Sequence, residues 1–165
     1  MNDYIKLKQR NTLRVGIKDE NGTTKLDQDG QEVFIEFDLE DLDVIDNYSK
    51  AIAGCEKASN TLKMDLLVID KKPDVEVQEG LTKNQKAKME ALKKYYKSIE
   101  KAMDLFLGEG GFSKIFGKKR YLTMLDDLAE MLTPIMPLFK VNIDNIHKKI
   151  TTKYKMTDEN VLKDE

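Results

Sequence analysis

The chain has 165 residues, of which 40% are hydrophobic and 35% charged, and its formal net charge is −2. This size and apolar content suffice for one hydrophobic core and exclude a chain that is disordered throughout, while the near balance of charge argues against a polycation that binds nucleic acid. The single cysteine excludes an intramolecular disulfide, and because neither a signal peptide nor a membrane span is predicted, we expect a cytoplasmic protein.

A small antiparallel β element is the first predicted feature, at about residues 12–37. Apolar residues alternate with polar residues or glycine at both of its ends, which is the pattern of half-buried strands. The pairs Asn21-Gly22 and Asp29-Gly30 between the ends are turn signals. Two arrangements remain open: two long strands, or a three-stranded meander with residues 24–26 as its middle strand. We find no internal repeat.

A long helix is predicted at about residues 39–70, where the apolar spacing changes from two to three or four. Asp38 is the predicted N-cap, and further acids in the first turn suit the positive end of the helix dipole. Gly54 lies within this helix, where it either bends the helix or permits close packing. The apolar stripe consists of Leu42, Ile45, Tyr48, Ile52, Cys55, Leu62, Leu66 and Ile69.

Three more helices are predicted after a polar linker, at about residues 82–107, 119–133 and 138–154. The first of them begins with a capping box formed by Thr82 and Gln85. Residues 155–165 have little to bury and are predicted to form a mobile tail. The pattern as a whole predicts a mainly helical α+β fold, a single bundle-like domain over residues 1–154 with a small N-terminal β element.

The segment Phe106–Gly117, FLGEGGFSKIFG, has the glycine content of a phosphate-binding loop. A dinucleotide-binding loop follows a strand and keeps a third glycine, whereas this segment follows the clearest predicted helix and has Ser113 at that position. The P-loop pattern fails as well, since Phe112 stands where its first glycine belongs. We therefore predict a helix C-cap at Gly108 or Gly110, followed by an aromatic turn.

The aromatic turn allows two interpretations, because Phe112, Ile115 and Phe116 fall on one side of a helical turn. In the first, these side chains close the core between two helices. In the second, they form part of a docking surface that the neighbouring glycines make mobile. The candidate partner-binding residues are therefore Phe106, Phe112, Ile115 and Phe116.

Residues for catalysis or metal binding are scarce in this sequence. His147 is the only histidine and lies in a lysine-rich segment, while Cys55 falls on the apolar stripe of the first predicted helix. One histidine and one cysteine cannot build a zinc site, and the acidic run at residues 38–46 lacks the spacing of a calcium loop. We predict no catalytic residue, no metal site and no cofactor, and hence a protein that is not an enzyme.

Charge is distributed unevenly along the chain. Eleven acids and one lysine lie between Asp19 and Asp46, whereas seven lysines and two glutamates lie between Lys83 and Lys101. This asymmetry is compatible either with two ordinary solvated faces or with charge-guided self-association or docking. Nucleic-acid binding by the lysine face has no support from a recognised motif or an aromatic stacking platform.

Two segments, residues 28–52 and 104–132, resemble the small tail assembly chaperones of long-tailed bacteriophages and related prophages of Gram-positive bacteria. In the first, QDGQEVFIEF leads into the acidic helix start FDLEDLDVIDNYSKAI, and in the second a helix ends in FLGEGGFSKIFG. The resemblance implies a mainly helical, non-enzymatic protein that binds the tape-measure protein and recruits the major tail protein. It also implies action in the cytoplasm of the host bacterium and absence from the mature virion.

Two other functions remain open from the sequence. The first is a structural component of the mature tail or of the head–tail junction, which would be found in purified particles where a chaperone would not. The second is a nucleic-acid-binding regulator that uses the lysine face, which would bind DNA in a salt-dependent manner.

Overall fold

The computed structural model describes residues 12–78 and 80–154, which form five helices and two small antiparallel sheets. The elements in chain order are β1 (Thr12–Gly16), β2 (Phe34–Asp38), α1 (Leu42–Asp70), β3 (Glu76–Gln78), β4 (Leu81–Thr82), α2 (Lys83–Leu107), α3 (Gly111–Phe116), α4 (Met124–Leu132) and α5 (Met136–Tyr154). The predicted mainly helical α+β fold is confirmed. The predicted mobile tail at residues 155–165 lies outside the described residues, as do residues 1–11.

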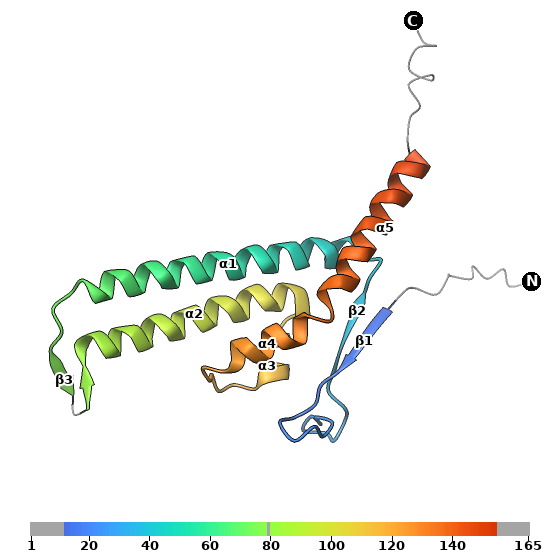
Figure 1. The fold of residues 1–165 in the computed structure, drawn as a ribbon. Helices are drawn as coiled ribbons and strands as arrows, with labels where there is room; N and C mark the ends of the chain where they lie inside the picture. The colour runs from blue at the N-terminus through green and yellow to red at the C-terminus, as the bar shows by residue number, and fades with distance from the viewer. Residues whose placement is uncertain (1–11, 79, 155–165) are drawn as a thin grey trace, which may run out of the picture.

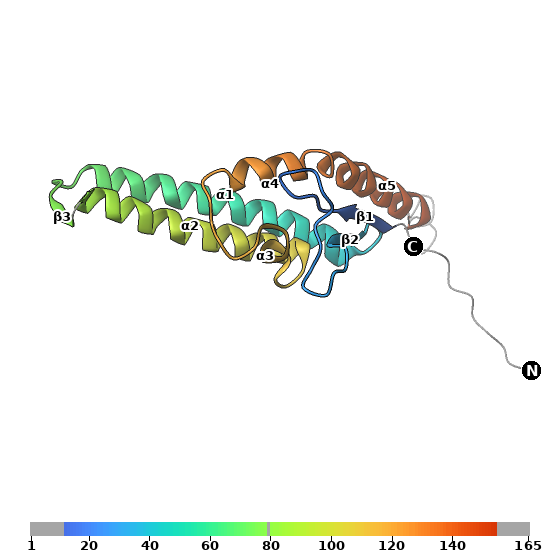
Figure 2. The same cartoon turned by 90° about the horizontal axis from the view of Figure 1, so that it is seen from below.

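The antiparallel hairpin of α1 and α2 is the longest feature of the fold (Figure 1). At one end, which we call the head, the hairpin meets α3, α4, the β1–β2 sheet and the start of α5. At the other end, which we call the arm (residues 61–70 and 83–94), the two helices extend beyond α3, α4 and α5, and the small β3–β4 sheet lies at the tip, as Figure 2 also shows. A Cβ atom built on Gly54 of α1 would lie only 2.9 Å from Cβ of Ala102 on α2. Gly54 therefore permits close packing of the two helices.

The start of α1 differs from the prediction, because Asp41 rather than Asp38 caps the helix. Asp38 is the last residue of β2, and its carboxylate accepts a hydrogen bond from the backbone N–H of Glu40 at 3.1 Å. The chain therefore makes one further turn before the helix begins. The carboxylate of Asp41 then accepts the N–H of Asp43 at 2.9 Å, which satisfies one of the free donors of the first helical turn.

The predicted capping box at the start of α2 is confirmed. The N–H of Thr82 donates to Oε1 of Gln85 at 2.9 Å, and the N–H of Gln85 donates to Oγ1 of Thr82 at 3.2 Å. The helix ends at Leu107, and both candidate glycines follow it with positive φ, Gly108 at 90° and Gly110 at 70°. Only Gly110 has the left-handed helical conformation.

The third predicted helix is shorter than expected, since its first part is a loop. The helix, α4, begins at Met124, whereas the prediction began at about residue 119. A separate short helix, α3, forms from the predicted aromatic turn. Between them, Oη of Tyr96 donates to the carbonyl of Tyr121 at 2.7 Å. The same carbonyl accepts the N–H of Met124 at 3.2 Å in the turn that precedes α4, so the hydrogen bond from Tyr96 ties this turn to α2.

The β element contains two turns of the same kind. Residues 19–23 (DENGT) and 27–31 (DQDGQ) form the same turn. In each, the first aspartate accepts backbone N–H groups two and four residues later, and the glycine has a φ of 75°. The side chains otherwise differ, and the equivalence is visible mainly in the hydrogen bonds.

The two turns bring three segments of the β element together, and backbone hydrogen bonds join each segment to the other two. The N–H of Ile17 donates to the carbonyl of Val33, that of Val33 to Lys25, and that of Lys25 to Ile17. Residues 24–26 otherwise form isolated bridges, so the element is neither two long strands nor a regular meander. Lys25 also ties it to the helices, because its ammonium group donates to the carbonyl of Ile115 in α3 at 2.6 Å.

Four aromatic side chains from four elements build the core of the head. Phe37 of β2 stacks on Phe106 of α2 with ring centroids 4.6 Å apart, and Tyr48 of α1 stacks on Phe139 of α5 at 5.1 Å. Phe106 also meets Phe139 edge-on at 5.1 Å. Because Phe139 is the buried residue of α5, this cluster attaches α5 to the head, from which the helix then projects (Figure 1).

Candidate functional site

The predicted partner-binding residues lie mostly in the core. Phe112 is 0% exposed, and Phe106 and Ile115 are buried as well, at 6% and 8%. Phe116 is half-buried, with its ring centroid 4.8 Å from that of Phe112. Phe106 belongs to the aromatic cluster of the head, whereas the other three belong to α3. These positions favour the core interpretation of the aromatic turn, and partner binding through these side chains stays a prediction.

Asp104 holds the glycine loop against the end of α2. Its Oδ1 accepts the N–H of Phe112 at 2.9 Å, and its Oδ2 accepts the N–H of Gly110 at 3.3 Å. Packing requires a glycine at residue 111, since a Cβ atom on Gly111 would lie 2.6 Å from Cβ of Leu107. The glycines therefore build a tight connection that places α3 against α2.

A polar cluster fastens α3 and the loop after it to α2. Nη2 of Arg120 donates to Oε2 of Glu100 at 2.5 Å, and Oγ of Ser113 donates to the other carboxylate oxygen at 2.9 Å. The hydrogen bond from Arg120 is the largest cause that holds the pKa of Glu100 below its ordinary value. Both oxygens of the Glu100 carboxylate accept hydrogen bonds, so we interpret this cluster as a structural contact and not as an acid–base site.

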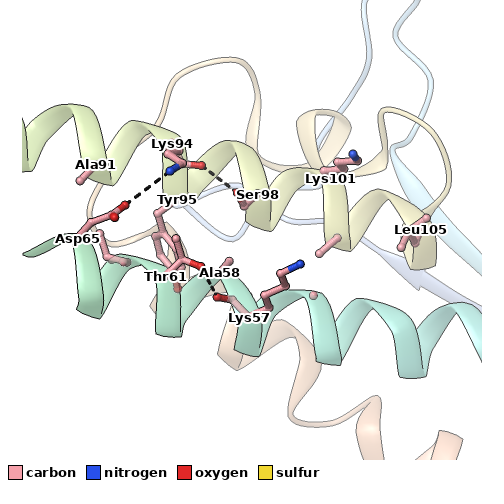
Figure 3. Close-up of a pocket in the computed structure, with 13 residues that line it drawn as sticks. Lys57, Ala58, Thr61, Asp65, Ala91, Lys94, Tyr95, Ser98, Lys101 and Leu105 are labelled. Atoms are coloured by element: carbon pink, nitrogen blue, oxygen red, sulfur yellow. Dashed lines mark hydrogen bonds and ion pairs between the residues drawn. The ribbon is translucent and has the colours of Figure 1, made fainter.

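An open groove lies between α1 and α2, about midway along the hairpin (Figure 3). Its volume is about 410 Å³. Small residues leave this space unfilled: Gly54 and Ala58 line it from α1, and Ala91 and Ala102 line it from α2. The larger apolar residues that line it are Leu62, Tyr95 and Leu105. The groove can therefore receive apolar side chains from another molecule.

Charged side chains border the groove unevenly. Lys57 of α1 and Lys101 of α2 line it from opposite walls, and both are exposed (Figure 3). Toward the arm, Nζ of Lys94 lies 3.7 Å from a carboxylate oxygen of Asp65 on the other helix. Within residues 12–78 and 80–154, neither Lys57 nor Lys101 has a carboxylate partner of this kind. The groove is thus cationic toward the head and neutral toward the arm.

Further large apolar side chains are exposed on the arm and on α5. On the arm, Met64 and Leu67 of α1 are 61% and 56% exposed. On α5, Phe139 is buried, whereas Ile150 is 50% exposed. Both elements project from the head, and apolar side chains gathered on projecting elements are typical of surfaces that bind other proteins.

Neither residue considered for catalysis lines the groove. Cys55 is half-buried against the core, where burial raises the pKa of its thiol, and a protonated thiol is a poor nucleophile. His147 is exposed on α5. Among the described residues, no cluster of histidine, cysteine, aspartate and glutamate is arranged to hold a metal ion. None of the described helices is long and apolar enough to cross a membrane.

Comparison with known proteins gives a family match over most of the chain. The model of a family described as Family of unknown function (DUF6673) matches residues 29–160. No match was found among curated proteins or among solved structures. The matched range includes both helices of the hairpin, and therefore all the residues that line the groove.

Proposed function

The chain belongs to the DUF6673 family, and we propose that it is a non-enzymatic phage tail assembly chaperone. It binds the tape-measure protein and recruits the major tail protein while the tail is built. It acts in the cytoplasm of the bacterial host and leaves before the particle is complete. The open groove between α1 and α2 is the observation that carries this proposal, and the resemblance of residues 28–52 and 104–132 to such chaperones supports it independently.

A tape-measure protein is a long, largely helical chain whose apolar stripes need cover until tail subunits surround it. Two packed helices accept a third helix where the side chains between them are small enough to admit its apolar stripe. Gly54, Ala58 and Ala102 provide such a floor. The apolar residues exposed on the arm and on α5 would extend the contact beyond the groove.

Weak binding at each groove suits this role, because the tail subunits must be able to displace the chaperone. A groove of about 410 Å³ holds only a few side chains of a partner helix. Many copies would nevertheless keep a long partner covered if the chaperone is abundant, since the occupancy of each site depends on the concentration of free chaperone as well as on the affinity. The chemistry needed is apolar contact, which requires neither a catalytic group nor a cofactor.

Co-expression with the tape-measure protein of the same phage or prophage tests the proposal. The intact chain is expected to raise the soluble fraction of that partner. Thr61→Trp fills the groove from an exposed position that lines it and is expected to abolish the effect. Asn60→Trp places the same ring one residue away, at an exposed position that does not line the groove, and serves as the matched control.

A partner that precipitates equally with and without the chain would contradict the proposal. If Thr61→Trp solubilised the partner as well as the intact chain does, the groove would be excluded as the binding site. The protein composition of purified particles separates the alternative role, since a structural tail component would be present in them and a chaperone absent.

A further inference from the structure

We infer that the groove between α1 and α2 selects a helix whose apolar stripe is bordered by acidic side chains, with Lys57 and Lys101 as the residues that determine this specificity. The inference rests on the proposed function in that the partner is a helix of another protein. It adds the charge of that helix, which neither the fold nor the family match assigns.

The two lysines stand at the same level of the groove. Gly54 of α1 and Ala102 of α2 face each other at the floor. Lys57 and Lys101 lie close to these two residues in sequence and line the groove from opposite walls (Figure 3). A helix that lays its apolar stripe on the floor would therefore have one lysine along each edge.

The lysines are available to a partner because their charge is not neutralised by the described part of the chain. The other lysine of the groove, Lys94, pairs with Asp65, whereas no ion pair within residues 12–78 and 80–154 engages Lys57 or Lys101. An incoming helix with lysine or arginine at its edges would meet like charge on both walls. A helix with glutamate or aspartate at its edges would instead meet two cations. The bound helix would exclude water from these cations, which strengthens the attraction.

Neither α4 nor α5 satisfies this requirement. Helix α5 has an exposed apolar stripe, but its charged residues are mostly basic: Lys140, Lys148, Lys149 and Lys153 against Asp144. Helix α4 carries Asp126, Asp127 and Glu130, but its apolar residues Met124, Leu128 and Leu132 are buried in its own core. Charge and burial thus favour a separate polypeptide over α4 or α5 of a second copy.

Two model peptides test the inference directly. Both are 21-residue helices with the same leucine and alanine stripe, and they differ only in having glutamate or lysine along both edges. Fluorescence anisotropy at low salt is expected to show about tenfold tighter binding of the glutamate-edged peptide, since a pair of exposed ion pairs changes affinity by roughly this factor. Added salt is expected to reduce this preference.

Charge reversal at the two lysines is the decisive variant. Lys57→Glu with Lys101→Glu is expected to reverse the preference, so that the lysine-edged peptide binds tighter. Both side chains are exposed, so the variant should keep the circular dichroism spectrum of the intact chain. The matched control is Lys63→Glu with Lys86→Glu, which changes one exposed lysine on each helix outside the groove and is expected to keep the original preference.

Three results would overturn the inference. The first is equal binding of both peptides by the intact chain. The second is an unchanged preference after reversal of Lys57 and Lys101. The third is that the same reversal abolishes a dimer in sedimentation or binding to a DNA duplex, which would assign the lysines to those partners.

The co-expression experiment and the peptide experiment together distinguish a failure of the proposed function from a failure of the inferred charge preference. If the intact chain keeps the tape-measure protein soluble but shows no charge preference, the proposed function stands and the charge rule fails. If the peptides show the preference but the tape-measure protein precipitates, the groove binds acidic-edged helices and the proposed function fails.

Discussion

Gly54→Ala is expected to destabilise the protein, although glycine in a helix is normally less favourable than alanine. Relief of the helix penalty alone would stabilise α1 by roughly 1 kcal/mol. The new Cβ atom, however, would lie 2.9 Å from Cβ of Ala102, well inside the contact distance of about 3.5–4.0 Å. Overpacking of this kind costs roughly 1–3 kcal/mol. We therefore expect a net loss of about 1 kcal/mol in the free energy of unfolding, measured with urea.

A second substitution separates the two contributions. Ala102→Gly alone is expected to destabilise α2, because it adds a helix penalty and removes a buried methyl group. In the double variant the methyl group moves from one helix to the other, so the two changes should compensate with a coupling of about 2 kcal/mol. Ala53→Gly, at an exposed neighbour on α1, measures the helix penalty without the contact. A stabilising Gly54→Ala with no coupling to residue 102 would refute the close approach of the two helices.

Two further predictions concern the attachment of α3. Phe112→Ala is expected to lower the free energy of unfolding by about 3–5 kcal/mol, because the ring is fully buried, and Phe116→Ala by less, because that ring is half-buried; similar urea midpoints for the two variants would contradict this packing. The pKa of Glu100 is lowered in the folded protein, so its contribution to stability is present above the ordinary pKa of 4.5 and is lost as pH falls through the folded value. The difference in thermal midpoint between the intact chain and Glu100→Gln should therefore shrink from pH 7 to acid, and a constant difference would exclude the ion pair with Arg120 as its cause.

The helices of the hairpin could be predicted because their signals are local. The capping box of Thr82 and Gln85 and the regular apolar spacing of α2 depend only on neighbouring residues. The predicted start of α1 was wrong because several nearby aspartates are each able to cap a helix. Asp38 pairs with β1 as part of β2, and the cap therefore falls to Asp41. The loop before α4 is bound by Tyr96, a residue remote in sequence, so neighbouring residues alone do not indicate this contact.

The groove was not predicted, although its residues are visible in the sequence. Small residues recur on both helices at positions such as Ala58 and Ala91. Small residues between helices either let the backbones meet, as at Gly54 and Ala102, or leave an open space, and the local separation of the helices decides which. The roles of Lys57 and Lys101 depend on the same packing, since their position on opposite walls follows only once the two helices are paired.

The aromatic cluster of the head also bears on the order in which the chain folds. Phe37 and Phe139 touch across roughly one hundred residues of sequence, with ring centroids 5.6 Å apart. The α1–α2 hairpin, by contrast, is closed by a short connection between Asp70 and Lys83. Because contacts between distant residues carry a larger loop-closure entropy and form later, we expect the hairpin to assemble before α5 is docked. The groove would then exist on a nascent chain whose head is still incomplete, and a partner made at the same time could meet it there.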